Sequence, residues 1–344
     1  MKLNDLCEVF ETLSFPRVDE ISHPEKAVVR QARDKISEAI LDECFLSDCL
    51  FYELQLIESN RLRRGLVPFF IHPNLGIQFA FGYWQPGVTP GPHEHTAWTI
   101  TAVCRNTLQI LTYDRDESYR RQELVPKNCF QALAGEVGYI YEPCIHEPRN
   151  NTHNWSFSLH ITSPRDGEPL NDYVEPLSVL SFPGQSPVTS EEHPYFHVLR
   201  ARQRERHLRQ IVHILTTINA PTTSKLFQKC YELSSTATRR LINFIAPKFS
   251  LDVLPESQWI LRKTHANLIL NSHCEEDMVL LCMETPRGLQ EMFRISSIAR
   301  EAIDFVAKEP IFNLKKIPGN LSDDEMILLG EALENTGLFR RACQ

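Results

Sequence analysis

The sequence predicts an α+β protein with N-terminal helices, an antiparallel β-barrel and a mostly helical C-terminal domain. Three observations predict this order. Apolar residues recur at helical spacing within residues 1–64. Short β-branched and aromatic runs, broken by Gly, Pro and Asn, fill the first part of residues 65–194. Helical spacing returns in residues 195–344, and this length is enough for two domains.

The N-terminal helices are predicted from two apolar patterns. Residues 27–44 place apolar side chains three and four apart, and Pro24 precedes them in a first-turn position. The apolar stretch 49–57 continues the same layer. We therefore expect residues 1–64 to form a helical layer against the β-barrel.

Six short runs predict the strands of the barrel. Each is rich in β-branched or aromatic residues, and they occupy 67–70, 77–84, 98–103, 108–113, 139–141 and 155–162. Runs at such close intervals favour an antiparallel sandwich or barrel around an interior site. Residues 165–195 are rich in Pro, Ser and Gly, which is typical of a linker or packed loop.

The C-terminal domain is predicted to be helices around one hairpin. The expected helices are 198–218, 225–233, 235–245, 295–306 and 322–336, and the expected strands are 259–270 and 278–283. The polar residues 271–277 would be the hairpin loop. Ser322 and Glu325 form an N-terminal capping box, and Gly337 ends that helix. This order resembles a winged-helix domain.

Composition excludes several classes of protein. The net charge of −8 gives no general reason to bind nucleic acid or an anionic membrane surface. No apolar window approaches the length of a membrane span, and no signal peptide is expected. Ten cysteines without C-x-x-C pairs indicate reduced thiols of a cytoplasmic protein.

A candidate metal site begins at G-V-T-P-G-P-H-E-H-T-A-W, residues 87–98. His93 and His95 are two residues apart, so on an extended backbone both imidazoles point the same way. His146 is the expected third ligand, from a distant strand. The chain has 13 histidines, so an H-x-H pair can also arise by chance.

Two motifs together resemble the cupin superfamily over residues 65–165. They are G-x5-H-x-H from Gly87 and G-E-x9-H-x3-N, which ends at Asn150. Many cupins carry a glutamate ligand shortly after the second histidine, where this chain has Thr99 and Ile100. The resemblance therefore implies a site of three histidines without a carboxylate, which suits Fe(II).

A narrower resemblance is to bacterial 3-mercaptopropionate dioxygenases and, more distantly, cysteine dioxygenases. P-H-E-H-T-A-W is similar to their H-x-H-T-x-W segment, and S-F-S-L-H-I-T to their S-x-H-x-Y strand. The resemblance implies a mononuclear non-haem Fe(II) oxygenase that uses O2 on a thiol, either small or bound to a peptide or carrier. Ser158 and His160 would belong to a Ser-His-Tyr relay, in which Thr162 replaces the tyrosine.

Substrate recognition is predicted from the same resemblance. Thiol dioxygenases fix a carboxylate with arginine, and the candidates are Arg64, its neighbour Arg63, and Arg165. Trp98 is a candidate pocket wall, and Tyr83, Tyr139 and Tyr141 are the candidates for the missing phenol. Each has an ordinary alternative, since arginines are mostly solvated and aromatic residues on strands mostly belong to the core.

The second function considered is a metal- or ligand-sensing cupin regulator with a winged-helix output domain. The C-terminal domain could form a homodimer, present a substrate or bind DNA. The basic run at 200–209 favours DNA, but acidic residues at 275–277 and 323–325 disfavour a phosphate-binding face. The substrate, the atom oxidised and the oligomeric state stay open.

Overall fold

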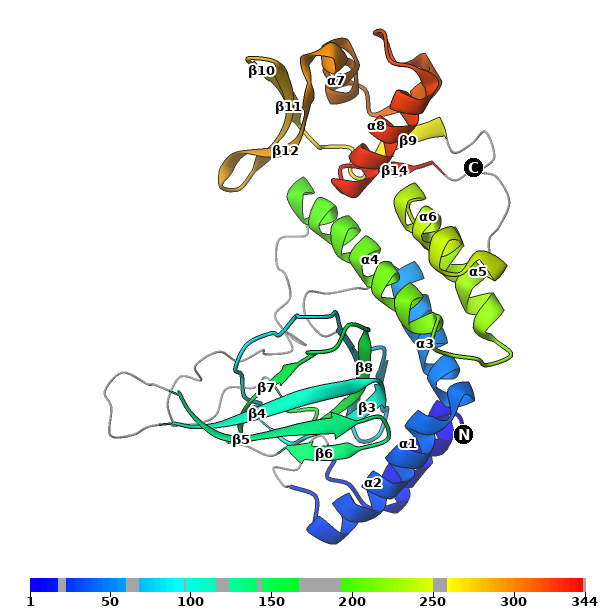
Figure 1. The fold of residues 1–344 in the computed structure, drawn as a ribbon, viewed down its shortest axis with the longest axis vertical. Coiled ribbons are helices and arrows are strands. Elements are labelled where there is room, and N and C mark those ends of the chain that lie inside the picture. Colours follow the sequence, from blue (N-terminus) through cyan, green and yellow to red (C-terminus); the bar gives the residue numbers. More distant parts are fainter. Residues whose placement is uncertain are drawn as a thin grey trace. The chain divides into compact units, whose positions relative to one another are not determined.

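The protein is described by a computed structural model that covers residues 1–17, 23–59, 68–95, 97–115, 124–140, 144–166, 193–249 and 259–342. The chain divides into two compact units. The first comprises Met1–Gln185 with Gln210–Leu226, and the second Ser186–Arg209 with Phe227–Gln344. The N-terminal helices and the β-strands therefore share one unit (Figure 1).

Three helices open the first unit. They are α1 (Leu3–Thr12), α2 (Lys26–Leu41) and α3 (Glu43–Glu58). Asp42 separates the last two, because its backbone is extended and its carboxylate accepts a hydrogen bond from the Cys44 amide at the start of α3. The sequence prediction had instead extended one helix through residue 44. Apolar faces of all three helices are buried.

The β-strands of the first unit form two antiparallel sheets. One has the order β1 (Phe70–Ile71), β2 (Gln78–Trp84), β8 (Ser156–Thr162), β3 (Thr99–Arg105), β6 (Val137–Ile140). The other has the order β5 (Leu124–Leu133), β4 (Thr107–Arg115), β7 (Ile145–Arg149). The predicted antiparallel strands are confirmed, and among the described residues they form two sheets without ladder hydrogen bonds between them.

Two strands, β5 and β7, have no counterpart among the predicted runs. β5 lies at the edge of its sheet, is almost entirely exposed and contains Pro126. An edge strand needs neither an apolar face nor an unbroken row of amide donors. Its sequence therefore lacks the alternation that identifies a half-buried strand. β7 is short and contains Pro148, but it carries His146.

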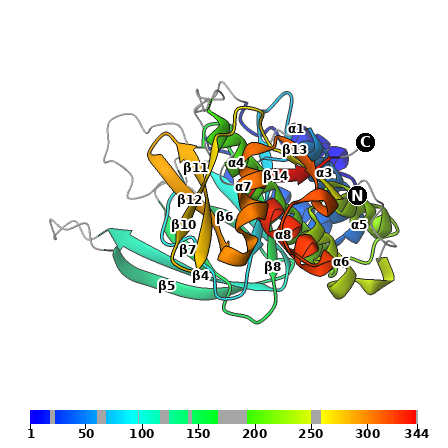
Figure 2. The same cartoon turned by 90° about the horizontal axis from the view of Figure 1, so that it is seen from above.

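The second unit holds more β-structure than predicted. Its helices are α4 (Pro194–Leu215) and α5 (Thr223–Leu233), both shared with the first unit, followed by α6 (Thr236–Ile245), α7 (Arg300–Lys308) and α8 (Asp323–Asn335). Its sheets have the orders β10 (Leu270–Glu275), β11 (Met278–Thr285), β12 (Gly288–Ser296) and β13 (Ile311–Asn313), β9 (Ile260–Lys263), β14 (Phe339–Arg341). Helices still contain more residues of this unit than strands do, and the strands add two small sheets to them (Figure 2).

The predicted hairpin loop in this unit is mostly strand. Asn271 to Glu275 belong to β10, and the turn to β11 is shorter, with Glu276 at φ 50°. The error arose because β10 is largely exposed, so its residues are polar. The capping box of α8 is confirmed: Ser322 Oγ accepts from the Glu325 amide. Gly337, past its C-terminus, has the expected positive φ of 74°.

No helix in the described ranges is both long and apolar enough to cross a membrane. The cysteines within those ranges are all free thiols.

Candidate metal centre

The three predicted histidines meet where the extended segment before β3 pairs with β7. His93 lies in an extended segment rather than a regular strand, and it forms an isolated antiparallel bridge with His146 of β7. The His93 amide donates to the His146 carbonyl at 2.9 Å, and the His146 amide donates to the His93 carbonyl at 2.8 Å. This pairing brings residues 53 apart in sequence side by side, as opposite positions of antiparallel strands require.

The imidazole rings of His93, His95 and His146 converge. The ring centroids of His93 and His146 are 4.4 Å apart, those of His95 and His146 5.3 Å, and those of His93 and His95 5.7 Å. One nitrogen from each ring lies within 4.8 Å of the other two, and all three residues are buried. The predicted convergence of three histidines is confirmed.

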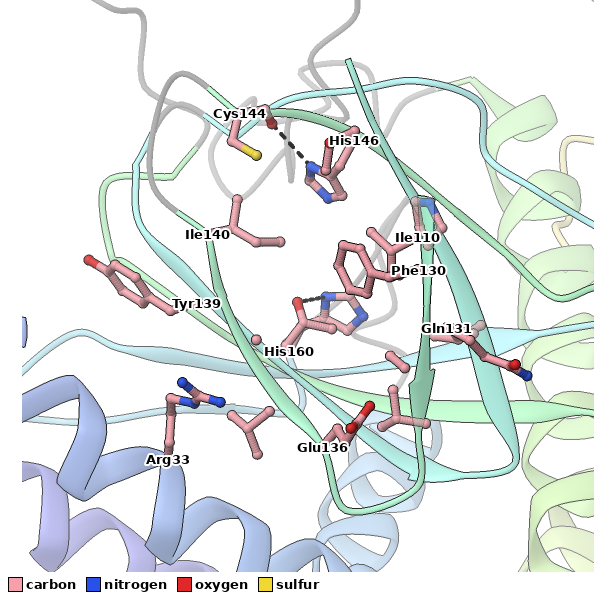
Figure 3. A pocket seen from close by; sticks show the side chains of 18 of the residues that line it. Arg33, Ile110, Phe130, Gln131, Glu136, Tyr139, Ile140, Cys144, His146 and His160 are labelled. Atoms are coloured by element: carbon pink, nitrogen blue, oxygen red, sulfur yellow. Dashed lines mark hydrogen bonds between the residues drawn. The ribbon is translucent and has the colours of Figure 1, made fainter. Parts of the chain in front are cut away.

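Each of these rings is oriented by a hydrogen bond at its Nδ1 atom. The partners are the Gly91 carbonyl at 3.0 Å for His93, the Cys144 carbonyl at 3.1 Å for His146, and Asp166 Oδ2 at 2.9 Å for His95. All three partners are acceptors, so the proton of each neutral ring lies on Nδ1. Each Nε2 then keeps its lone pair for a metal, and the donor set therefore fits a divalent ion (Figure 3 shows the His146–Cys144 contact).

Burial keeps the His93 and His146 imidazoles neutral at physiological pH. Desolvation lowers the pKa of His146 to about 3, with smaller contributions from the neighbouring His93 and His95. Desolvation also lowers the pKa of His93. Protons therefore compete little with a metal ion for these nitrogens near pH 7.

The loop before His93 is held by a second group of polar residues. Glu147, next to His146, is buried and accepts hydrogen bonds from Arg149, Tyr113 and Thr89. The Arg149 guanidinium, followed by these hydroxyls, lowers the pKa of Glu147 to about 2. Thr89 in turn accepts from the Gly91 amide at 3.0 Å. Glu147 thereby fixes the turn whose carbonyl orients His93.

Sequence reasoning missed Asp166 and Glu147 as parts of the site. Asp166 is 71 positions from His95, and no local pattern joins the two. Glu147 had a weak signal, since it directly follows a predicted ligand and precedes Arg149 by two residues. Asn150, noted in the sequence motif, is fully buried and donates to the Trp84 and Asn154 carbonyls, so it supports the turn after β7.

Replacing Asp166 with asparagine is expected to weaken metal binding about 10- to 100-fold, because the His95 ring loses its charged acceptor. Competition with a chromogenic chelator would measure the dissociation constant. Asp114→Asn is the matched control, since that exposed carboxylate forms an ion pair with the exposed Lys127. Equal affinities of Asp166→Asn and wild type would show that Asp166 does not support the ligand.

The predicted relay residues lie on one face of β8. Ser158 Oγ and His160 Nε2 are 2.9 Å apart, and Trp84 Nε1–H donates to the same Ser158 oxygen at 2.7 Å. The Ser158 hydroxyl can therefore donate to His160 Nε2, which leaves the ring proton on Nδ1, 3.4 Å from Thr101 Oγ1. Thr162 is buried two residues further along β8 and is not among the cavity-lining residues.

The metal-free protein is expected to lose stability below about pH 6.5 through His160. Burial lowers the pKa of this imidazole from its ordinary 6.5 to about 3. Between these values the unfolded chain binds the extra proton, so stability falls with falling pH, by up to about 1.4 kcal/mol per pH unit. Above pH 6.5 this contribution is constant.

Urea unfolding at pH 7.5, 6.0 and 5.0 would test this, with His160→Gln as the comparison. The free energy of unfolding of His160→Gln should fall less steeply with falling pH than that of the wild type, because glutamine does not titrate. Parallel pH profiles for the two proteins would contradict the prediction.

A cavity of about 690 Å³ adjoins the three histidines (Figure 3). His93, His146, His160 and Trp84 line it, together with apolar residues of β3, β4 and β6. His160 and Trp84 therefore face the same space as two of the proposed ligands. The cavity provides room for a substrate beside a metal ion.

The predicted substrate-binding residues lie elsewhere. Trp98 is buried and packs on Phe15, with ring centroids 5.5 Å apart, and the Tyr83 hydroxyl donates to Glu53 of α3. Neither they nor Arg165 line the cavity. Arg64 and Arg63 lie outside the described residues. Tyr83 thus lies on the face of β2 that meets α3, and Trp98 packs just before β3 against the segment that follows α1.

Neither a family profile nor a curated protein sequence matches this chain. Solved structures of cupin-superfamily proteins do resemble it. The Mn(II)-containing oxalate decarboxylase of Bacillus subtilis is 17% identical, with a TM-score of 0.22, and the match covers 30% of this chain and 23% of that one. This chain thus matches about a quarter of the length of that enzyme.

Two smaller structures show the same resemblance. A cupin-superfamily protein of Desulfitobacterium hafniense is 15% identical, with a TM-score of 0.20, over 25% of this chain and 66% of that one. A cupin-2 barrel protein of Salinispora arenicola is 18% identical, with a TM-score of 0.20, over 25% and 60%.

Proposed function

We propose that this protein is a mononuclear non-haem Fe(II) oxygenase that oxidises a thiol with O2. The supporting observation is the convergence of three buried imidazoles, each with its Nδ1 atom next to an acceptor and with one nitrogen of each ring within 4.8 Å of the other two. Three neutral ligands leave a divalent ion its full charge and open positions, a combination suited to an anionic thiolate and O2 together.

Iron bound by His93, His95 and His146 would supply Lewis acidity and redox chemistry, with positions for both reactants. The balanced reaction adds both atoms of O2 to the sulfur, so a thiol and O2 give a sulfinic acid. All four electrons come from the sulfur, so no further reductant is required. Holding both reactants in one site removes much of the entropic barrier between them.

His160 is proposed to donate a hydrogen bond to the reacting groups. Ser158 and Trp84 fix its Nε2 side, while its Nδ1–H meets Thr101 only at the long distance of 3.4 Å. The Nδ1–H group of His160 can therefore donate a hydrogen bond to a ligand in the cavity. Tyr139 also lines the cavity, but its hydroxyl points away from His160 (Figure 3). Thr162 keeps a proposed role as a buried hydroxyl on the same face of β8.

The test begins with anaerobic reconstitution. The expected result is about one Fe(II) bound per chain, followed by thiol-dependent O2 uptake and a sulfinate product detected by mass spectrometry. The panel contains free cysteine, 3-mercaptopropionate, cysteamine, short cysteine peptides and 1-octanethiol. His160→Gln should still bind Fe(II) but turn over more slowly. Failure to bind Fe(II), or O2 uptake that no thiol stimulates, would refute the proposal.

A further inference from the structure

The cavity beside the three histidines is much larger than a small thiol. Its volume of about 690 Å³ equals on the order of 20 water-sized groups at ~30 Å³ each. A thiol of about six non-hydrogen atoms would fill roughly a quarter of it. The remaining space would hold water against apolar walls, which gives a small substrate little binding energy.

The walls between the two ends of the cavity are apolar or uncharged. Val103, Ile110, Val137 and Ile140 contribute aliphatic surface, and Thr101 contributes a hydroxyl. Apart from the histidines, the charged residues among the described lining residues are Arg33, Asp34 and Glu136, all of them exposed.

The charged residues are far from the ligand histidines along the cavity. Arg33 and Glu136 lie at the end opposite His146, with His160 between them (Figure 3). A thiol held at the histidines with a carboxylate two or three bonds away would place that carboxylate in the apolar section. Burying a charge without a partner is costly. The described walls therefore disfavour short thiol carboxylates.

Exposed apolar side chains also lie in the cavity wall and next to it. Phe130 lines the cavity and is 52% exposed. Leu41 at the end of α2 is 56% exposed, and its side chain lies over Gly135, a lining residue of the turn between β5 and β6. Apolar side chains that stay exposed beside a cavity are typical of a site that takes up an apolar ligand.

We infer that the substrate has a long, uncharged and largely apolar body. Its reactive end would lie at His93, His95 and His146, and its body beside Phe130 and between Val103, Ile110 and Val137 (Figure 3). The identification of the reactive end rests on the proposed function, whereas the apolar body rests on the cavity walls alone.

The test is ligand binding by the metal-free protein, so it does not depend on turnover. N-phenyl-1-naphthylamine, an uncharged probe that fluoresces in apolar sites, reports occupancy, and three thiols compete with it. They are 1-octanethiol (long, uncharged), 1-propanethiol (short, uncharged) and 3-mercaptopropionate (short, charged). We expect 1-octanethiol to displace the probe at a concentration at least about 10-fold lower than either short thiol.

Two cavity variants and one control make the test specific. Ala132→Trp fills the opening from β5, and Ile110→Asp places an unpaired carboxylate in the apolar section. Both should weaken binding of the probe about 10-fold or more. Val125→Trp, an exposed position on β5 outside the cavity, should leave binding unchanged. Circular dichroism and a thermal melt identify any variant that does not fold.

The outcomes separate this inference from the proposed function. Displacement by 3-mercaptopropionate as readily as by 1-octanethiol would overturn the inference. So would undiminished probe binding by a folded Ala132→Trp variant. Strong binding of 1-octanethiol without O2 uptake by the iron-loaded protein would uphold the apolar site and refute the oxygenase.

Discussion

Replacing His146 with alanine is expected to lower the affinity of the protein for Fe(II) on the order of 1000-fold, or ~4 kcal/mol. One of three ligands is lost, and the other two imidazoles cannot complete the site. The backbone bridge between residues 93 and 146 uses only main-chain atoms, so alanine preserves it. The His146→Ala variant should therefore fold but fail to bind the metal ion.

Calorimetric titration of the anaerobic protein would measure this loss. His153→Ala is the matched control, because His153 is an exposed histidine of the same unit and not part of the three-histidine group. It should bind Fe(II) like the wild type. Retention of full affinity by His146→Ala would show that the converging rings do not form the metal site.

Replacing Gly82 with alanine is expected to destabilise the first unit by about 2 kcal/mol and to slow turnover. A Cβ atom at Gly82 would lie 2.6 Å from Ser158 Oγ, 2.8 Å from His160 Nε2 and 2.9 Å from Trp84 Nε1. These are the three atoms of the hydrogen-bonded chain that fixes His160. The added methyl group must push the side chains of Trp84, Ser158 and His160 apart.

Gly138→Ala is the control for this prediction. Gly138 is also a strand glycine of the same sheet, but an added Cβ would meet only the Thr101 carbonyl at an ordinary 3.8 Å. Urea unfolding measures stability, and the intrinsic fluorescence of Trp84 reports its surroundings. If Gly82→Ala matched Gly138→Ala in stability, fluorescence and turnover, the chain through Ser158 would have no positioning role.

The orientation of two metal-ligand rings is set by neighbouring residues, so it can be predicted from the sequence. His93 and His146 each direct Nδ1 to the carbonyl two residues earlier, at Gly91 and Cys144. Gly91 adopts φ 85°, a conformation that glycine reaches without steric cost. The glycine-rich turn and the residues after it predicted an extended backbone. On an extended backbone, His93 and His95 point to the same side.

The arrangement of the strands was harder to predict because exposed edges carry no apolar signal. Both β5 and β10 are largely exposed; β5 has no counterpart among the predicted strands, and most of β10 was predicted as a hairpin loop. Both strands are stabilised by backbone hydrogen bonds, β5 to β4 and β10 to β11, and not by burial of their side chains. Sequence periodicity identifies buried faces, so it cannot identify strands of this kind.

The sequence alone determined which three imidazoles are available and that two of them share one side of an extended segment, because residue type and alternation are properties of neighbours. Only the tertiary structure decided that Asp166 orients His95, that Trp98 and Tyr83 pack away from the cavity, and that the cavity is large and apolar. These features depend on contacts between residues far apart in the chain, such as Phe15 with Trp98 and Glu53 with Tyr83.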